Sequence, residues 1–134
     1  MKSKSLWKTN FQSVVDNGRS HSIVIDLPES KGGTNSGPTA LEMCVMSFSG
    51  CVGTIFATVA QKMRLTYEAM EVEVDAEQKE SAHTISDIHF ILSIKTTEEK
   101  SRVERCLTHT INTCPVGILF KQAGICITSE IKLI

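Results

Sequence analysis

The chain has 134 residues, of which 22% are charged and 5% aromatic, and its formal net charge at pH 7 is −1. This length suits one domain with a real hydrophobic core, and we expect a single domain over residues 1–134. A chain with balanced charge and few aromatic residues lacks the basic surface and stacking platforms that nucleic acids require, and the basic excess that binds anionic membranes. We therefore expect neither nucleic acid nor a membrane as a partner.

The cysteine pattern indicates thiols rather than a disulfide framework. The N-terminal segment MKSKSLWKTN is positively charged, but no apolar run follows it, so it does not predict a signal peptide and we expect a cytoplasmic protein. An odd number of widely spread cysteines, in a chain whose sequence predicts no signal peptide, favours free thiols over disulfides, some of these thiols being reactive. The five are Cys44, Cys51, Cys106, Cys114 and Cys126. The sequence contains no paired C-x-x-C zinc motif and no Gly-rich phosphate loop.

The N-terminal part of the chain predicts two strands and a loop. Residues 5–15 mix apolar and polar side chains in the manner of a strand, and the turn signal Asp16-Asn17-Gly18 follows them. Residues 21–27 alternate apolar and polar positions, which predicts a second strand antiparallel to the first. Residues 28–38 are rich in Gly, Ser, Asn and Pro and predict a loop.

Residues 39–65 predict a long helix around which the rest of the chain is organised. No charge lies between Glu42 and Lys62. Large apolar residues recur at steps of three and four, as on a helix: Leu41, Val45, Phe48, Val52, Ile55, Val59 and Met63. Thr39 and Glu42 match a capping box, which is the favoured interpretation of Glu42. Hydroxyl and amide side chains dilute the apolar run, so a buried central helix is favoured over a membrane span.

Two cysteines of this helix are the first candidates for chemistry. Cys44 and Cys51 lie seven residues apart and therefore share one side of the helix, close to the apolar stripe. Gly50 and Gly53 flank Cys51, so another backbone or a small ligand can approach it. The alternative is that both cysteines are small apolar residues in a core, which is the usual role of a cysteine outside a disulfide.

The C-terminal half predicts a hairpin, two helices and a last strand. Residues 70–76 alternate strictly between apolar and acidic side chains, and a solvated strand face explains the acidic row better than a metal site does. A polar loop over residues 80–84 leads to a second alternating strand from Ile88 to Ile94. Thr96 and Glu99 match another capping box at the start of a helix. The inner face of this helix is predicted to hold Val103, Cys106, Leu107, Ile111 and Cys114.

Cys114 stands at a predicted junction between two helices. Pro115 ends the preceding helix and suits the first position of a short new one, which makes Cys114 its N-cap. The helix dipole at that position favours a thiolate, so we expect a lowered pKa for Cys114. A last strand follows Gly124.

This order of elements predicts an α+β fold with antiparallel sheet packed on the long helix. One small sheet and two short helices are too little to cover so apolar a helix. A homodimer that buries the helix from both sides solves this problem.

Two segments, GGTNSGPTALEMCVMSFSGCVGTIFATVAQKMRL and TCPVGILFKQAG, resemble the OsmC/Ohr superfamily of osmotically inducible and organic-hydroperoxide-resistance proteins, most closely its OsmC-like branch. The shared pattern is a Gly-Pro loop, a Leu-Glu helix start, a Gly-Cys-x-Gly centre and a second cysteine at a helix junction. The resemblance implies an intertwined homodimer with antiparallel sheets packed on the long central helix. It also implies an active site at the subunit interface and thiol-dependent peroxidase activity in oxidative-stress defence.

By position, the resemblance implies that Cys51 is the peroxidatic cysteine and Cys114 the resolving one. The implied cycle takes an organic hydroperoxide to its alcohol through a Cys51 sulfenate and a Cys51–Cys114 disulfide. A small or protein dithiol then reduces the disulfide, so no bound cofactor is expected. Arg19 matches the arginine that supports the thiolate, and Glu42 is the nearest match to the glutamate that orients it. The hydroperoxide-resistance pattern places that glutamate where this chain has Leu41.

Two further hypotheses remain open. The offset of Glu42 motivates a redox-sensing or small-apolar-ligand-binding module without efficient turnover. The third hypothesis is a metal site, but the spacing of its candidate ligands fits no known pattern. These candidates are Cys44, Cys51, Cys106, Cys114 and His109.

Overall fold

The computed structural model describes residues 1–79, 81 and 83–134, which fall into two compact units, Met1–Cys44 and Val45–Ile134. The expected single domain stays a prediction, and the two units are described one at a time. The long helix begins in the first unit and runs on into the second.

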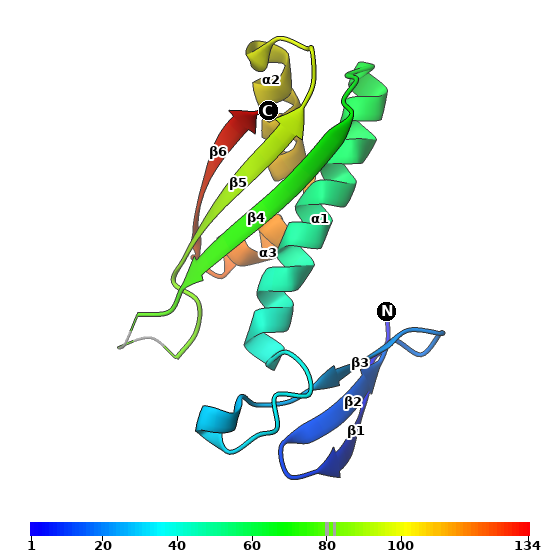
Figure 1. Cartoon of the computed structure of the whole chain (residues 1–134), viewed down its shortest axis with the longest axis vertical. Coiled ribbons are helices and arrows are strands. Elements are labelled where there is room, and N and C mark those ends of the chain that lie inside the picture. Colours follow the sequence, from blue (N-terminus) through cyan, green and yellow to red (C-terminus); the bar gives the residue numbers. More distant parts are fainter. Residues whose placement is uncertain (80, 82) are drawn as a thin grey trace. The chain divides into compact units, whose positions relative to one another are not determined.

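The first unit contains a three-stranded antiparallel sheet of β1 (Lys4–Thr9), β2 (Gln12–Asp16) and β3 (Ser22–Ile25) in that order (Figure 1). The prediction of one strand over residues 5–15 is wrong, because the chain turns at Asn10, whose φ is 44°. Apart from that, the hairpin prediction is confirmed. Gly18 turns with φ 70°, and its N–H donates to Asp16 Oδ1 at 2.8 Å.

The predicted loop over residues 28–38 is confirmed, with one short 3₁₀ turn, η1 (Glu29–Lys31), inside it. The carboxylate of Asp26 organises this loop, although the sequence marks it only as one position of a strand. Asp26 is 2% exposed and accepts hydrogen bonds from the backbone N–H groups of Leu27, Thr34 and Ser36 and from the Thr34 hydroxyl. These bonds lower the pKa of Asp26 to about 2, the Thr34 hydroxyl contributing most.

Two glycines of the loop lie against the backbone of the preceding segment. A Cβ on Gly33 would lie 1.9 Å from the Leu27 carbonyl oxygen, and one on Gly37 would lie 2.2 Å from the Val24 carbonyl oxygen. No side chain fits at either position without moving the backbone. Close backbone packing therefore explains two of the glycines in the GG…GP pattern.

Helix α1 (Ala40–Met63) starts with the predicted capping box. The Thr39 N–H donates to Glu42 Oε2 at 2.6 Å, and the Glu42 N–H donates to Thr39 Oγ1 at 3.2 Å. Its four buried residues repeat every four positions: Phe48, Val52, Phe56 and Ala60. Part of the predicted apolar stripe is thus correct, whereas Ile55 and Val59 are only half-buried.

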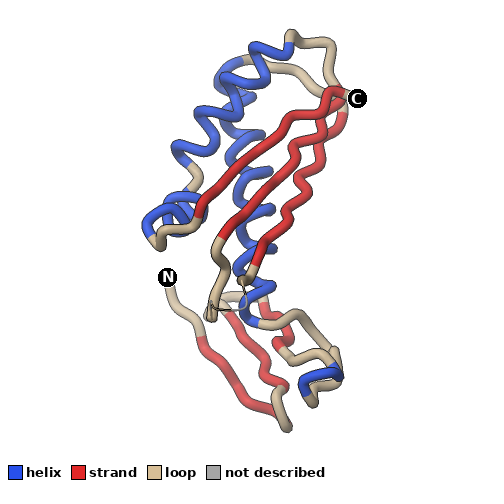
Figure 2. Tube along the Cα trace, turned by 90° about the vertical axis from the view of Figure 1, so that its left-hand side faces the viewer, coloured by secondary structure: helices blue, strands red, loops and turns tan. Residues whose placement is uncertain are grey.

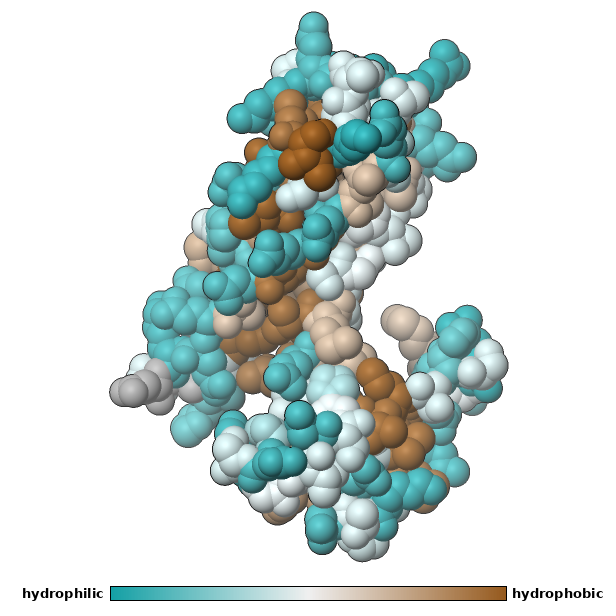
Figure 3. Space-filling view, in the orientation of Figure 1, coloured by the Kyte–Doolittle hydropathy of each residue, from teal (hydrophilic) through white to brown (hydrophobic). Residues whose placement is uncertain are grey.

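Much of α1 remains uncovered by the chain itself. By length and composition it could cross a membrane, with a mean hydropathy of 1.7, and only 22% of that stretch is buried. Core helices of soluble proteins pass the same test, but they are mostly buried. Figure 3 shows the outer side of α1 in the second unit mainly in pale and brown tones rather than teal, so this surface is neutral to apolar.

The second unit contains a three-stranded sheet in the order β4 (Ala69–Glu77), β5 (Asp87–Lys95) and β6 (Cys126–Leu133), with helices on one face (Figure 2). The predicted hairpin of β4 and β5 and its alternation are confirmed. On β5, the inward residues are buried: Ile88, Phe90, Leu92 and Ile94. The expectation of a purely antiparallel sheet is wrong for one pair, because β6 runs parallel to β5. The predicted loop over residues 80–84 includes Glu80 and Ala82, which lie outside the described residues.

Helices α2 (Lys100–Thr113) and α3 (Pro115–Gln122) complete the second unit. The inner face of α2 is largely as predicted, with Val103, Cys106 and Leu107 buried. The predicted Thr96–Glu99 capping box is wrong, because Glu99 itself is the N-cap and makes no side-chain cap bond. The Thr96 hydroxyl instead accepts the N–H of Glu98 and donates to the Thr66 carbonyl.

Arg102 connects α2 to the end of α1, although the sequence predicts it on the outer face. Its guanidinium donates to the carbonyl oxygens of Met63 at 2.8 Å and Arg64 at 3.2 Å, and it pairs with Glu98. The Glu98 carboxylate also accepts the Thr66 N–H at 3.0 Å. Carbonyl groups at a helix end have no partner within the helix, so Arg102 supplies one for α1.

Candidate thiol site

The thiols of Cys51 and Cys114 meet in the second unit. Cys51 lies in the middle of α1, Cys114 lies between α2 and α3, and their Sγ atoms are 3.0 Å apart across 63 residues of sequence. Cys51 is half-buried, whereas Cys114 is fully buried. A reagent from solvent therefore has access to Cys51 and not to Cys114.

Cys114 is the predicted N-cap of α3, and this prediction is confirmed. Its Sγ accepts the Gly117 N–H at 3.4 Å, and Pro115 opens the helix. The predicted direction of its pKa is wrong. Burial raises the pKa of the Cys114 thiol to about 11, and the hydrogen bond with Cys51 acts in the same direction. The Gly117 N–H lowers this pKa, but its effect is smaller than the loss of hydration.

Three aromatic rings from three elements pack beside the thiol pair. Phe48 of α1 meets Phe90 of β5 edge to face at 5.7 Å between ring centroids, and it stacks on Phe120 of α3 at 5.6 Å. Gly117 faces the same ring, because a Cβ there would lie 3.4 Å from Phe48 Cε2. Sequence reasoning placed Phe48 on the inner stripe of the helix but gave no role to Phe120 or Gly117.

Arg19 and Glu42 belong to the first unit, whereas Cys51 and Cys114 belong to the second. Arg19 follows the turn between β2 and β3, is exposed, and donates its backbone N–H to Asn17 Oδ1 at 3.0 Å. Glu42 takes part in the α1 capping box, and the bonds with Thr39 lower its pKa. Among the described residues, no ion pair joins Arg19 to Glu42. Their catalytic assignment stays a prediction, as do those of Cys51 and Cys114.

The remaining cysteines are placed differently. Cys106 is fully buried on α2, and burial raises its pKa to about 11. Cys126 is exposed at the start of β6, and Cys44 is exposed near the start of α1, where its Sγ lies 3.5 Å from the Ala40 carbonyl oxygen. Across the part of the chain that the structure describes, no group of three or more His, Cys, Asp or Glu side chains is arranged to hold a metal ion.

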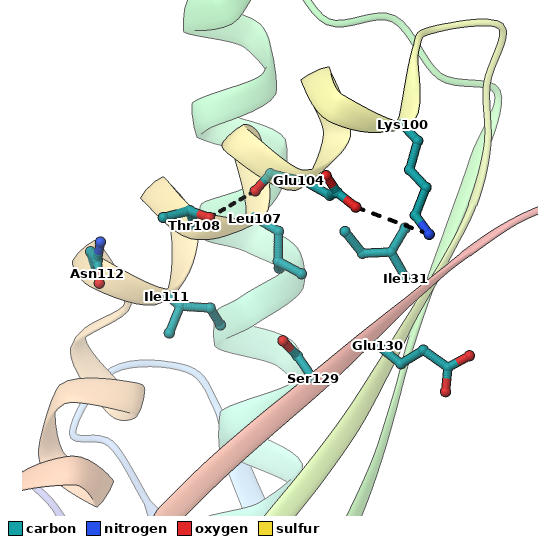
Figure 4. Close-up of a pocket in the computed structure, with 9 residues that line it drawn as sticks. All are labelled: Lys100, Glu104, Leu107, Thr108, Ile111, Asn112, Ser129, Glu130 and Ile131. Carbon is teal, nitrogen blue, oxygen red and sulfur yellow. Dashed lines mark hydrogen bonds and ion pairs between the residues drawn. The ribbon is translucent and has the colours of Figure 1, made fainter.

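A groove of about 570 Å³ lies in the second unit between α2 and β6 (Figure 4). Leu107, Ile111 and Ile131 form its apolar part, and Lys100 and Glu104 flank it. No cysteine lines it, so it is separate from the thiol site.

The fold and the site together define an α+β protein in which thiols from two different helical segments meet. A family model described as OsmC-like protein matches residues 33–130. The chain therefore belongs to the OsmC-like family, within the OsmC/Ohr superfamily. No curated protein matches the sequence.

Solved structures share the fold at low sequence identity. An OsmC-like protein from Mycoplasma pneumoniae has a TM-score of 0.88 and 11% identity, covering 99% of this chain and 96% of that one. An organic hydroperoxide resistance protein OsmC from Legionella pneumophila has a TM-score of 0.74 and 10% identity, covering 98% and 95%. An organic hydroperoxide resistance protein from Elizabethkingia anophelis, with thiocyanate bound, has a TM-score of 0.74 and 12% identity, covering 98% and 94%.

Proposed function

We propose that the protein is a thiol-dependent peroxidase that reduces organic hydroperoxides. The observation that carries the proposal is the 3.0 Å contact between a half-buried and a buried thiol from separate elements. Family membership supports it, because structural neighbours include organic hydroperoxide resistance proteins. A cytoplasmic role in oxidative-stress defence, without a bound cofactor, belongs to the same proposal.

In the first step, the Cys51 thiolate attacks the terminal oxygen of the hydroperoxide. The O–O bond breaks, the alkoxide leaves and takes up a proton as the alcohol, and Cys51 becomes a sulfenic acid. Access favours Cys51 in this role, since Cys114 is fully buried. The pKa of about 11 also keeps Cys114 a neutral thiol at pH 7, so it is a poor first nucleophile.

In the second step, the Cys114 sulfur attacks the Cys51 sulfur. The S–O bond breaks, and the hydroxide that leaves combines with the Cys114 proton to form water. A small or protein dithiol then reduces the disulfide by exchange at the more accessible sulfur, Cys51, and restores both thiols.

Arg19 and Glu42 are assigned to the same site in this proposal. Arg19 supplies the cation that favours the Cys51 thiolate, and Glu42 orients its guanidinium. The active unit is a homodimer, in which a second copy covers the exposed side of α1. The 22% burial of the apolar stretch of α1 supports this arrangement.

The test is turnover of tert-butyl and cumene hydroperoxides, with hydrogen peroxide for comparison. Dithiothreitol and then a lipoyl dithiol serve as reductants for the wild-type chain, Cys51→Ser and Cys114→Ser. We expect loss of the organic hydroperoxides with the wild type and none above the uncatalysed rate with Cys51→Ser. In Cys114→Ser, Cys51 should accumulate as sulfenate or higher oxides, visible by intact mass. Equal consumption by wild type and Cys51→Ser would exclude the proposal.

One observation favours a second function. Glu42 Oε2 accepts the Thr39 N–H in the α1 capping box, and so the carboxylate already has a structural role. A redox-sensing or small-apolar-ligand-binding module without efficient turnover needs no catalytic glutamate. It predicts a Cys51–Cys114 disulfide that forms readily under mild oxidation while turnover stays negligible with every reductant.

A further inference from the structure

The Asp26 carboxylate joins the two legs of the loop that leads into α1. Asp26 directly follows β3, and its Oδ1 accepts the Leu27 N–H of the outgoing leg at 2.8 Å. Its Oδ2 accepts three hydrogen bonds of the returning leg, from the Thr34 hydroxyl at 2.6 Å and from the Thr34 and Ser36 N–H groups at 3.1 Å each. The carboxylate is 2% exposed, so these charge-assisted bonds hold the returning leg without competition from water.

The returning leg then lies directly on the backbone of β3 and the residues after it. The Asn35 N–H donates to the Leu27 carbonyl at 3.1 Å, and the Asp26 N–H donates to the Pro38 carbonyl at 3.2 Å. Between these two bonds, a Cβ on Gly37 would lie 2.2 Å from a carbonyl oxygen of β3, so this contact admits no side chain. The carbonyl of Pro38 is therefore fixed relative to Asp26.

One peptide group connects Asp26 to Glu42. The carbonyl of the Pro38–Thr39 peptide accepts the Asp26 N–H, and the N–H of the same peptide donates to Glu42 Oε2 at 2.6 Å. The peptide is planar and trans, so its carbonyl and its N–H point in opposite directions. Fixing the carbonyl thus fixes the direction of the N–H, and with it the position of the Glu42 carboxylate.

The bond to Thr39 occupies one carboxylate oxygen of Glu42 and leaves the other available. Among the residues that the structure describes, Glu42 Oε1 has no hydrogen-bond partner. A carboxylate that is held through one oxygen presents the other in a defined direction, which a group that orients a guanidinium requires. The capping box and the role proposed for Glu42 toward Arg19 are therefore compatible.

We propose that Asp26 is a positioning residue, whose carboxylate holds the returning leg so that the Pro38–Thr39 peptide directs Glu42 toward Arg19. This inference deepens the proposed function and rests on its assignment of Glu42 and Arg19. Asparagine has the shape of aspartate but only one acceptor oxygen, so it cannot serve both legs of the loop. Asp26→Asn therefore separates the two legs while filling the same space.

The first measurement is the exchange of the Thr39 amide proton with water, followed by NMR in the full chain at pH 7. In Asp26→Asn this proton should exchange about tenfold faster than in the wild type, because the peptide that carries it is no longer held. Arg102→Ala is the control, since it weakens the far end of α1 and leaves the loop of Asp26 intact. It should not change the exchange at Thr39. Equal exchange in wild type and Asp26→Asn would overturn the inference.

The second measurement places Asp26 and Glu42 in one double-substitution cycle. Its readout is kcat/KM for cumene hydroperoxide, with dithiothreitol as the reductant. Asp26→Asn and Glu42→Gln should each lower kcat/KM about tenfold, and the double variant should be no slower than Glu42→Gln alone. Arg102→Ala should keep the wild-type kcat/KM, although it also lowers stability. Effects of Asp26→Asn and Glu42→Gln that multiply would overturn the inference, because Asp26 would then act by another route.

Thr34→Val decides the matter if Asp26→Asn does not fold. It removes only the hydroxyl that donates to Asp26 Oδ2, and it keeps the carboxylate and both backbone donors. The Thr39 proton should exchange about threefold faster, with a similar fall in kcat/KM, and unchanged values would overturn the inference. Faster exchange at Thr39 in a chain without hydroperoxide turnover would exclude the peroxidase alone, whereas normal turnover in Asp26→Asn would exclude the role of Asp26 alone.

Discussion

At the scale of single residues, burial and hydrogen bonding set the protonation states of Cys114 and Asp26. Cys114 is neutral because it is desolvated, and so a short helix N-terminus beside it does not make it a thiolate. Asp26 is equally buried but accepts four hydrogen bonds, and so it stays ionised far into the acid range. The number of donors that each group meets decides its protonation state, and those donors come from the folded chain.

The pKa of Asp26 leads to a prediction about acid stability. Its native pKa of about 2 lies below the value of about 3.9 for an unfolded aspartate. The carboxylate therefore stabilises the fold fully above pH ~4, and this contribution is lost as the pH falls from about 4 to 2. Asp26→Asn should lower the thermal midpoint at pH 7 and flatten its fall between pH 5 and 2.5, as measured by circular dichroism.

The matched control for this experiment is Asp75→Asn, an exposed aspartate on the solvated face of β4. It should keep the wild-type dependence of the midpoint on pH. Identical acid profiles for wild type and Asp26→Asn would show that Asp26 does not set the acid stability.

At the scale of elements, the end of helix α1 depends on a side chain of helix α2. Helix α1 ends at Met63, and Arg64 takes a φ of 52° as the chain turns toward β4. Two carbonyls at this end are satisfied by Arg102, which lies 38 or 39 residues further along the chain. The start of α2 and the end of α1 are thereby tied together.

Arg102→Ala should destabilise the fold by about 1–2 kcal/mol, because it removes hydrogen bonds from two carbonyls and the partner of Glu98. Chemical denaturation in urea measures this free energy. Arg105→Ala, at an exposed position of the same helix, should change it by less than about 0.5 kcal/mol. Equal effects of the two substitutions would contradict the role assigned to Arg102.

At the scale of the whole molecule, much of the apolar helix α1 remains exposed. One of its sides packs against the second sheet and the other helices, whereas the other side exposes small and uncharged residues, among them Gly50, Thr54 and Thr58. Small residues allow the close approach of another helix, and this favours a second copy of the chain as the cover.

In the proposed homodimer, Thr54→Arg should therefore shift the equilibrium from dimer to monomer. A charge placed on this side of α1 would be buried without a partner, and we expect the dimer to weaken about 30-fold or more. Sedimentation velocity over a range of concentrations measures the change. Asn112→Arg, which adds the same charge to an exposed position of α2, should leave the dimer intact. A wild-type chain that is monomeric at all concentrations would refute the dimer.

The sequence by itself determined features whose causes lie within a few residues of each other. The capping box of Thr39 and Glu42, the alternation of β4 and β5 and the N-cap position of Cys114 all follow from local spacing, and all are correct. A local signal gave a wrong prediction where the side chain has a hydrogen-bond partner far away in the sequence. Thr96 looks like a cap but bonds the Thr66 carbonyl instead.

Only the tertiary structure decided the contacts between segments far apart in the chain. These are the meeting of Cys51 and Cys114 across 63 residues, the parallel pairing of β6 with β5 and the carbonyl partners of Arg102. The raised pKa of Cys114 belongs with them, because desolvation depends on every element packed around the thiol. Spacing along a sequence contains no measure of burial or of the hydrogen-bond donors that meet a group, and these together decide the direction of a pKa shift.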